Sequence, residues 1–388
     1  MLKKIKNLNA YVLRKKLRNI YFTCRHQLTY NNFSQKFVSN AKDKKFVFTL
    51  DLHTSVVRDF ASLLTIFNVV LTRWSITPSS HIFNEPNLKI KHVNNRTWKK
   101  LDSNLTKNFQ KTYSNFLIKQ NGFIISHTLS FVNLFKKYNL PILGINSTRY
   151  ESPFTFNHSS FLNLNSTLRD YSKLWLISNN IGDRDYLRYF TDLDSRYVPS
   201  LCNYTVQNKP ENDIWLIQCR NLDLAKKISI ISPNLKSLHE MWPKGYSYKE
   251  LSTVKGIVIL PNNISTMQIF ELTTAGFPIR IPSDRLLLEL KSIPGILSEL
   301  SYAQINERAV LDINLNSPMD PGWYNFYNWW LERADWNNID FFPNVTRFDT
   351  FEELAFEPKP FKIEAIYRRN TRISEMWKRN LENFMKSL

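Results

Sequence analysis

The sequence predicts an α/β protein built from two Rossmann-like, doubly wound domains in series. Apolar strand-like runs alternate with amphipathic helical stretches, which favours mostly parallel sheets covered on both faces. The alternation restarts beyond the polar stretch 207–212 (QNKPEN), and 388 residues are more than one core usually organises. We therefore expect a first domain at 1–205, a second domain at 206–350 and a C-terminal helical segment at 351–388.

Apolar periodicity sets the expected elements of the first domain. Residues 46–50 (FVFTL) predict a strand, and apolar side chains then recur at helical spacing, which predicts a helix at 54–71. Further strands are expected at 71–76, 122–126, 141–146, 174–178 and 196–200. Further helices are expected at 101–119, at 128–139 and from residue 182, with a polar loop at 77–100.

The second domain centres on the stretch 260–290 (LPNNISTMQIFELTTAGFPIRIPSDRLLLEL), which predicts a strand end, a polar turn, an apolar helix and another strand. Strands at 213–218 and 256–260 and a helix at 221–231 are expected before it, and a helical region at 321–338 after it. Residues 361–386 predict a long amphipathic helix. Because its apolar face needs a partner, we expect this helix to cross back onto the first domain.

Composition favours a globular protein of a reducing compartment. With 43% hydrophobic and 14% aromatic residues the chain can bury large cores, which excludes a disordered chain. Cys24, Cys202 and Cys219 have neither disulfide nor metal-ligand spacing. No apolar run reaches the roughly 18 residues of a membrane span, and no secretory signal is expected. We therefore expect a cytoplasmic location.

A net charge of +19 favours anionic partners such as nucleotides, phosphorylated substrates, nucleic acid or an anionic membrane surface. Residues 1–25 carry eight Lys and Arg and no acid. This segment is interpreted as a basic helix on a membrane surface, as a transit peptide, or as a solvated helix packed on the first domain. No recognised nucleic-acid-binding pattern is present, so nucleic acid is not the expected partner.

The polar turn of the second domain has the chemistry of an anion site. Ser265 and Thr266 stand where the helix is expected to begin, with Asn263 just before them. Backbone N–H groups at a helix N-terminus, with hydroxyls beside them, bind anions without a glycine loop. Glu271 is expected to reach back toward a ribose or sugar hydroxyl. The alternative is that Ser265 is an ordinary N-cap and Glu271 a solvated or capping acid.

Strand ends of the first domain supply candidate catalytic groups. Asp51 and His53 stand two apart at a strand end and therefore share one face. A histidine there can act as general base for an acceptor hydroxyl, oriented by a nearby carboxylate. His127 follows another strand and is the second candidate, although a lone strand-end histidine is more often structural. Arg149 and Glu151 follow a further strand and are predicted to bind acceptor, to close the cleft or to form an interdomain ion pair.

Residues 265–290 resemble the donor-site helix of GT-B glycosyltransferases. The resemblance implies that Glu271, followed by Gly276 and Pro278, holds the ribose or donor sugar. It also implies that Arg220, directly after a strand, and Lys226 or its neighbour Lys227 contact the donor diphosphate. A base at the place of His53 resembles inverting members of the fold, and one at the place of His127 resembles some retaining members.

The triplets Asp183-x-Asp185 and Asp192-x-Asp194 match the metal signature of the other large glycosyltransferase fold, GT-A. Both lie in or beside a predicted helix rather than at a strand end. We therefore predict no essential metal.

The expected function is transfer of a sugar from a nucleotide-diphospho-sugar to a hydroxyl acceptor, which is a glycan, a protein or a lipid. A nucleic-acid-binding protein and a catalytically inactive GT-B scaffold are the alternatives. Within the GT-B fold the sequence is most similar to glycosyltransferases of large DNA viruses or eukaryotes.

Overall fold

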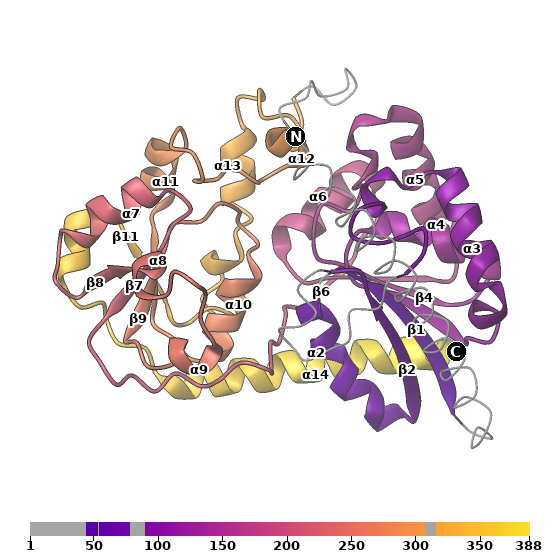
Figure 1. The fold of residues 1–388 in the computed structure, drawn as a ribbon, viewed down its shortest axis with the longest axis horizontal. Coiled ribbons are helices and arrows are strands. Elements are labelled where there is room, and N and C mark those ends of the chain that lie inside the picture. The colour runs from indigo at the N-terminus through magenta and orange to yellow at the C-terminus, as the bar shows by residue number, and fades with distance from the viewer. Residues whose placement is uncertain (1–43, 53, 78–89, 307–315) are drawn as a thin grey trace, which may run out of the picture.

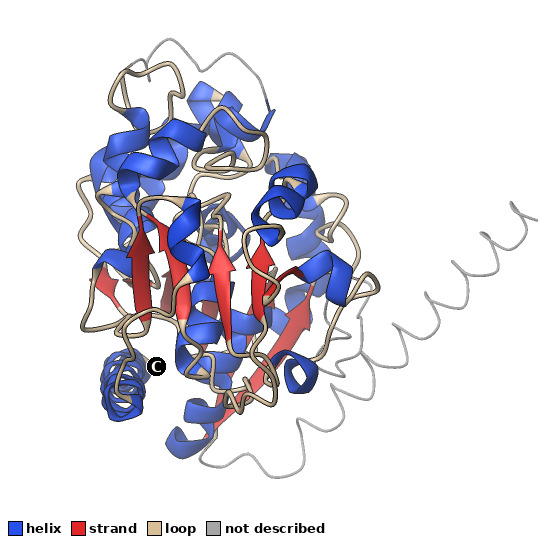
Figure 2. Cartoon of the chain, turned by 90° about the vertical axis from the view of Figure 1, so that its left-hand side faces the viewer, coloured by secondary structure: helices blue, strands red, loops and turns tan. Residues whose placement is uncertain are grey.

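The computed structural model describes residues 44–52, 54–77, 90–306 and 316–388. They form two α/β units that lie side by side, each with a parallel sheet flanked by helices (Figures 1 and 2). The predicted fold class, with two doubly wound sheets in series, is confirmed. The exact domain boundary near residue 205 stays a prediction.

The first sheet has six strands in the order β2-β1-β3-β4-β5-β6, and every pair is parallel. Its strands are β1 (Lys45–Asp51), β2 (Val69–Ser75), β3 (Gly122–Ile125), β4 (Ile142–Asn146), β5 (Leu174–Ser178) and β6 (Arg196–Tyr197). The second sheet has five parallel strands in the order β11-β10-β9-β7-β8. Its strands are β7 (Trp215–Gln218), β8 (Leu235–Ser237), β9 (Gly256–Ile259), β10 (Ile279–Pro282) and β11 (Val345–Phe348).

Both sheets share one strand order, in which the first strand lies between the second and the third. The order of strands therefore reverses between β1 and β3 in the first sheet and between β7 and β9 in the second. Ligands of open α/β sheets bind outside the carboxyl ends of the strands at such a switch point. The topology alone thus marks two places where a site is expected.

Helices connect the strands and cover the sheets (Figure 1). Those of the first domain are α2 (Thr54–Leu64), α3 (Ser103–Leu117), α4 (Val132–Phe135), α5 (His158–Asp170) and α6 (Ile181–Thr191). Those of the second are α7 (Leu222–Ser229), α8 (Leu238–Met241), α9 (Tyr248–Leu251), α10 (Met267–Thr274), α11 (Asp284–Leu290), α12 (Tyr302–Asn306) and α13 (Phe326–Leu331). The last helix is α14 (Ile363–Ser387).

Several predicted elements differ in extent. The helix expected at 54–71 ends with the 3-10 turn Thr65–Phe67, because Asn68 takes a left-handed conformation (φ 55°) and β2 begins directly after it. The helix expected at 128–139 is broken into α4 and two 3-10 turns, and that at 321–338 shortens to α13 and the 3-10 turn Asp335–Asn337. Helix α5 was not predicted, although Asn157 caps its N-terminus and its buried face is apolar.

Aromatic packing forms much of the first core. Phe48 on β1 meets Trp74 edge to face at 4.9 Å, and Phe123 on β3 stacks on Phe135 at 4.6 Å between ring centroids. Such pairs add about 0.5–1.5 kcal/mol beyond the area they bury. Among the described residues, no helix has the length and apolar character of a membrane span.

Buried Asp59 of α2 fixes the start of the connection between the two sheets. Its carboxylate accepts hydrogen bonds from the backbone N–H groups of Leu201 (2.9 Å) and Cys202 (2.6 Å). Burial raises the pKa of this carboxyl to about 7. The chain therefore passes beside α2 as it leaves the first domain, and α14 also contacts α2.

Helix α14 runs beneath both domains, as Figure 1 shows in yellow, and confirms the expected return to the first domain. On the first domain Trp377 is fully buried, donates from Nε1 to the Pro199 carbonyl (2.9 Å) and packs on Phe60. Toward the second domain, buried Arg369 donates from Nε to the Phe341 carbonyl (2.9 Å). One amphipathic helix thus packs on both units and connects them.

We expect Trp377→Ala to lower the free energy of unfolding by about 3–5 kcal/mol, because it empties a buried indole site. Urea denaturation measures the loss. Tyr367→Ala on the same helix is the matched control, since Tyr367 is 53% exposed and should cost about 1 kcal/mol or less. Equal losses in the two variants would contradict the packing of α14 on the first domain.

Candidate functional site

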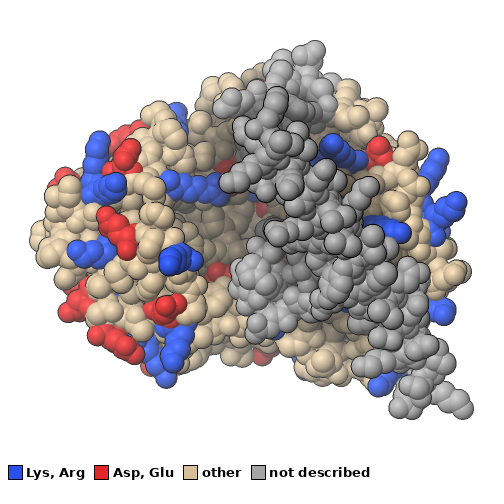
Figure 3. All heavy atoms as spheres, in the orientation of Figure 1, with Lys and Arg blue, Asp and Glu red and all other residues tan. Residues whose placement is uncertain are grey.

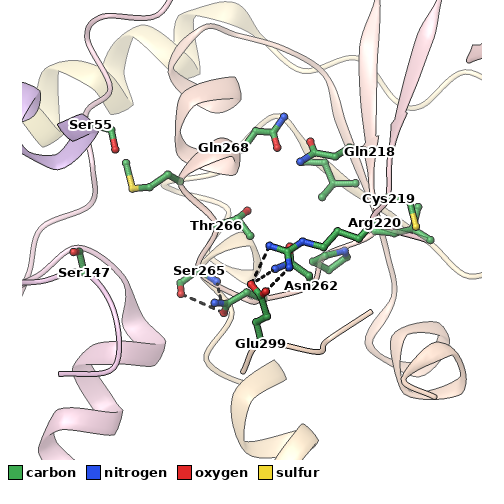
Figure 4. Close-up of a pocket in the computed structure, with 15 residues that line it drawn as sticks. Ser55, Ser147, Gln218, Cys219, Arg220, Asn262, Ser265, Thr266, Gln268 and Glu299 are labelled. Atoms are coloured by element: carbon green, nitrogen blue, oxygen red, sulfur yellow. Dashed lines mark hydrogen bonds and ion pairs between the residues drawn. The ribbon is translucent and has the colours of Figure 1, made fainter. Parts of the chain in front are cut away.

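A cavity of about 450 Å³ opens at the switch point of the second sheet, within the size range of small-molecule sites (Figure 4). Residues at the ends of β7 and β9 and at the start of α10 form most of its wall. Ser55 of α2 and Ser147, which follows β4, enter from the first domain. The described lining consists of Ser55, Ser147, Gln218, Cys219, Arg220, Ile259, Leu260, Pro261, Asn262, Asn263, Ser265, Thr266, Met267, Gln268 and Glu299.

The N-terminus of α10 forms one side of the cavity. Thr266 is the N-cap and its side chain makes no capping hydrogen bond, so the alternative interpretation of Ser265 as an ordinary N-cap is wrong. The hydroxyl of Ser265 instead lies 3.4 Å from Asn263 Oδ1. Since Thr266, Met267 and Gln268 all line the cavity, the positive end of the helix dipole is directed at it. The N-terminus of α10 thus faces the cavity, and its role as an anion site stays a prediction.

Arg220 and Glu299 form an ion pair across the cavity (Figure 4). Both guanidinium Nη atoms of Arg220 donate to the carboxylate, one at 3.0 Å, and Asn262 Nδ2 donates to the same carboxylate at 2.7 Å. These two are the only charged side chains of the described lining, so the lining is neutral overall. Arg220 is 57% exposed, and such exposed pairs contribute about 0–1 kcal/mol. An anion in the cavity can therefore compete for Arg220.

Arg149 lies at the junction of the two domains and is 3% exposed. From the loop after β4 it donates to Asn263 Oδ1 (2.8 Å) and to the carbonyls of Glu299 (3.1 Å) and Leu300 (2.6 Å) in the second domain. It thereby holds two lining segments of the cavity. Among the described residues its only ion-pair partner is Asp183 of the first domain, so its contacts across the junction are hydrogen bonds rather than the predicted interdomain ion pair. Contact of Arg149 with an acceptor stays a prediction.

Two further groups compensate the buried charge of Arg149. Asp183 of α6 forms an ion pair with its Nη1 at 3.4 Å, and the guanidinium lies 4.6 Å from the ring centroid of Trp330. Burial raises the pKa of the Asp183 carboxyl, and the nearby Arg149 charge opposes that rise. The cation is therefore paired, hydrogen-bonded and stacked, which is what a buried charge requires.

Glu151 is fully buried inside the first domain and does not line the cavity. Tyr186 donates to its Oε1 at 3.0 Å and Thr155 at 3.3 Å. Burial raises the pKa of this carboxyl to about 7. In this conformation the Glu151 carboxyl is not accessible to an acceptor, because it is packed against Tyr186.

Glu271 lies one helical turn beyond Gln268 on the same face of α10. Its carboxylate is held by two tyrosines: Tyr204 donates at 2.6 Å and Tyr248 bonds to it as well. Burial raises the pKa of the Glu271 carboxyl. Glu271 is not part of the described lining, so its contact with a donor stays a prediction. The same holds for Lys226, which is exposed on α7 outside the cavity.

The candidate catalytic groups lie at the carboxyl ends of β1 and β3. Asp51 is buried and accepts hydrogen bonds from Ser75 Oγ (2.7 Å) and Arg73 Nε (3.1 Å). His53 lies outside the described residues, but Ser55, two positions later, reaches the cavity. The chain segment after β1 therefore leads to the site.

His127 follows β3 and is 6% exposed. Its ring packs edge to face on Trp98, with 5.4 Å between the ring centroids. His127 and Asp51 thus lie at the carboxyl ends of the neighbouring strands β3 and β1, where the strand order reverses, and neither lines the cavity. Their catalytic roles stay predictions.

The aspartate triplets lie on or beside α6, as expected. Asp183 pairs with Arg149, Asp185 pairs with Arg184 and Arg333, and Asp192 is the left-handed C-cap of α6. Within the described residues, no group of three or more His, Cys, Asp or Glu side chains is arranged to hold a metal ion. The need for a metal stays untested.

Sequence reasoning placed Asn262 in the polar turn without giving it a role, and it did not single out Glu299, Gln218, Ser55 or Ser147. Gln218 and Ser147 carried a weak signal, because each polar residue ends or follows an apolar strand. Glu299 carried none. It stands in an irregular segment, and contacts with distant residues bring it to the site: its backbone N–H donates to the Asn262 carbonyl (2.9 Å), and its carbonyl accepts from Arg149 (3.1 Å).

No family model and no curated protein matches the chain. Solved structures do resemble it over most of its length. CalG4, the calicheamicin glycosyltransferase, is 9% identical over 89% of this chain and 95% of its own, with a TM-score of 0.38. The glycosyltransferase SnogD from Streptomyces nogalater is 8% identical over 89% and 98%, with a TM-score of 0.41.

UDP-GlcNAc 2-epimerase from Neisseria meningitidis, bound to UDP-GlcNAc, is 10% identical over 88% of this chain and all of its own, with a TM-score of 0.42. Glycosyltransferases are thus among the structures that this chain resembles. At these identities and TM-scores we draw no conclusion about activity from the likeness, and it gives no support to a viral or eukaryotic source.

Arg149→Met should lower the free energy of unfolding by about 3–5 kcal/mol, because it leaves Asp183 buried without its cation. Adding Asp183→Asn should recover part of that loss, and chemical denaturation of the four proteins of the cycle measures the coupling. Arg184→Met is the control, since its pair with Asp185 is partly exposed and should cost below about 1 kcal/mol. A loss no larger than that of the control would show that Arg149 does not anchor the junction.

Asp335 also joins the two domains and titrates near neutrality. Its Oδ1 accepts from the backbone N–H of Ile181 (3.1 Å) and from the Tyr197 hydroxyl (2.8 Å), both in the first domain. Burial raises the pKa of this carboxyl to about 8. In the unfolded chain the carboxyl ionises near pH 4, so its contribution to stability is present at low pH and is lost as the pH rises toward 8.

Between pH 5 and pH 8 we therefore expect the wild type to lose more stability than Asp335→Asn, by an amount on the order of a few kcal/mol. Urea denaturation at both pH values measures the difference. Asp340→Asn, which alters an exposed carboxyl, should follow the wild type. Parallel pH profiles of wild type and Asp335→Asn would rule out the buried carboxyl as the source.

Proposed function

We propose that this chain transfers a sugar from a nucleotide-diphospho-sugar to a hydroxyl acceptor. The observation that carries the proposal is the cavity at the switch point of the second sheet, where the N-terminus of α10 and Arg220 converge on the same space. Helix N-termini and arginines are the groups with which α/β folds bind phosphate. We base the proposal on this geometry rather than on the likeness to solved structures.

In the proposed complex the diphosphate lies at the start of α10. Its charge competes with Glu299 for Arg220, whose planar guanidinium suits two phosphate oxygens at once. Ser265 and Thr266 offer hydroxyls on the same wall, and Gln218 offers an amide for the ribose or the sugar. Glu271 takes its predicted role in this complex if its carboxylate exchanges Tyr204 for a ribose hydroxyl.

The first domain is proposed to supply the acceptor side. His53, supported by Asp51, takes the proton of the acceptor hydroxyl, and His127 is the alternative base. The acceptor oxygen then attacks the anomeric carbon, and the bond to the nucleoside diphosphate breaks. The α10 N-terminus and Arg220 stabilise the charge of the leaving group, which is the work a metal ion does in other enzymes. We propose that no metal is essential.

Isothermal titration of the full chain with UDP, GDP and dTDP tests donor binding. We expect at least one of them to bind in EDTA, and Arg220→Ala to weaken it about 10- to 150-fold, as expected for about 1.5–3 kcal/mol of charged hydrogen bonds. Glu299→Gln should bind more tightly than wild type, because it releases Arg220 and removes a negative charge.

Lys244→Ala is the matched control, since Lys244 is an exposed cation of the second domain outside the cavity. Its affinity should equal that of the wild type. If no nucleoside diphosphate binds the folded wild type at millimolar concentration, or if the Arg220 and Lys244 variants lose affinity equally, the donor site is wrong.

A further inference from the structure

The surplus of positive over negative charge lies entirely in the first part of the chain. Residues 1–205 contain 30 Lys and Arg against 11 Asp and Glu, whereas residues 206–388 contain 22 of each. The net charge of +19 is therefore carried by the part that holds the first sheet, and the part that holds the donor cavity is neutral. Figure 3 agrees for the surface it shows: basic and acidic side chains are interspersed on the second domain, at left, and basic ones predominate on the described surface of the first.

Several of these Lys and Arg residues are concentrated on one loop of the first domain. Residues 90–101, here called the basic loop, contain no acid and four exposed cations. These cations are Lys91, Arg96, Lys99 and Lys100. None of the four is in an ion pair with another described residue, so their charge is directed at solvent.

The basic loop is anchored to the first domain by specific contacts and lies next to the proposed acceptor site. The backbone N–H of Lys91 donates to the Tyr113 hydroxyl at 2.9 Å, which ties the loop to α3. Trp98, buried in the loop, packs on His127 at the carboxyl end of β3. The loop therefore borders the switch point of the first sheet, at the sheet edge from which Ser55 and Ser147 reach the cavity.

Building on the proposed function, we propose that the acceptor is an anionic glycan, a saccharide that carries several carboxylate or phosphate groups, and that the basic loop binds it. The second domain, which holds the proposed donor cavity, can bind a diphosphate without surplus charge, because Arg220 and the α10 N-terminus act on it at short range. The surplus charge of the first domain instead raises the local concentration of a polyanion and orients it.

The surroundings of the basic loop distinguish a glycan from other polyanions. Single-stranded nucleic acid is held by exposed aromatic rings that stack on bases, and Trp98, the one Phe, Tyr or Trp of this loop, is 7% exposed. A membrane surface requires exposed apolar side chains beside the cations, and the apolar residues Ile90, Val93 and Leu101 are buried. The loop thus offers charge and polar groups alone, which suits a charged carbohydrate.

Fluorescence anisotropy with labelled oligogalacturonate, and with neutral dextran oligomers of equal length, tests the proposal on the full chain. We expect oligogalacturonate to bind and dextran not to bind, and the affinity to fall as salt rises from 50 to 200 mM. Replacing Lys91, Arg96, Lys99 and Lys100 together by Gln should weaken oligogalacturonate binding at least tenfold. The matched control replaces Lys227, Lys236, Lys244 and Lys249, four exposed lysines of the second domain, and should stay within twofold of wild type.

A single-stranded oligonucleotide of equal charge forms the third arm. Tighter binding of the oligonucleotide than of oligogalacturonate, equal losses in the two quadruple variants, or absence of oligogalacturonate binding would each overturn the anionic acceptor. Nucleoside diphosphate titrations of the same proteins separate the two proposals. Intact nucleotide binding with no acidic-glycan binding refutes only the acceptor, whereas acidic-glycan binding without any nucleotide binding refutes the donor site. Unfolding midpoints near that of the wild type show that the variants are folded.

Discussion

The cavity and the junction between the two domains share one buried cation, Arg149. Its side chain is 3% exposed, so little water can reach the guanidinium, and each N–H group left without a partner would cost several kcal/mol. The guanidinium has partners on both sides of the junction: Asp183 in the first domain, and Asn263, Glu299 and Leu300 in the second. Two of these partners, Asn263 and Glu299, line the cavity. The same side chain therefore contributes to the position of one domain against the other and to the shape of the site.

Buried carboxyls reinforce that junction. Asp59 holds the start of the interdomain connection, and Asp335 holds the N-terminus of α6 and Tyr197 from the opposite domain. Burial raises the pKa of Asp59 to about 7 and that of Asp335 to about 8. Both groups accept hydrogen bonds best when ionised, yet their surroundings favour the protonated form. The interdomain contacts are therefore most sensitive to pH near neutrality, while the two sheets are held by backbone bonds and apolar packing that do not titrate.

The sequence allowed the sheets and the α10 side of the candidate site to be predicted, because both depend on local patterns. Strands such as β1 and β9 are short apolar runs, and the turn before α10 combines Asn263, Ser265 and Thr266 in one stretch. What could not be predicted depends on contacts between distant residues. Glu299 meets Arg220 from 79 positions away, and nothing near residue 299 marks it as a pocket residue. Glu271 shows the same limit, since its tyrosine partner Tyr204 comes from the interdomain connection.

The electrostatics of this protein act on two length scales. Inside the cavity the charges of Arg220 and Glu299 cancel, so the net charge of the lining contributes little to the binding of an anion. Affinity must come instead from directed contacts with the two Nη donors of Arg220 and with the N-terminus of α10. Outside it, the first domain carries the whole net charge, and such a field extends about one Debye length, roughly 8 Å at physiological salt. A ligand that fills the cavity is selected by fit, whereas a ligand that lies along the first domain is selected by charge. Under the proposed function, a compact donor would therefore be selected mainly by the shape of the cavity and an extended anionic acceptor mainly by the charge of the first domain.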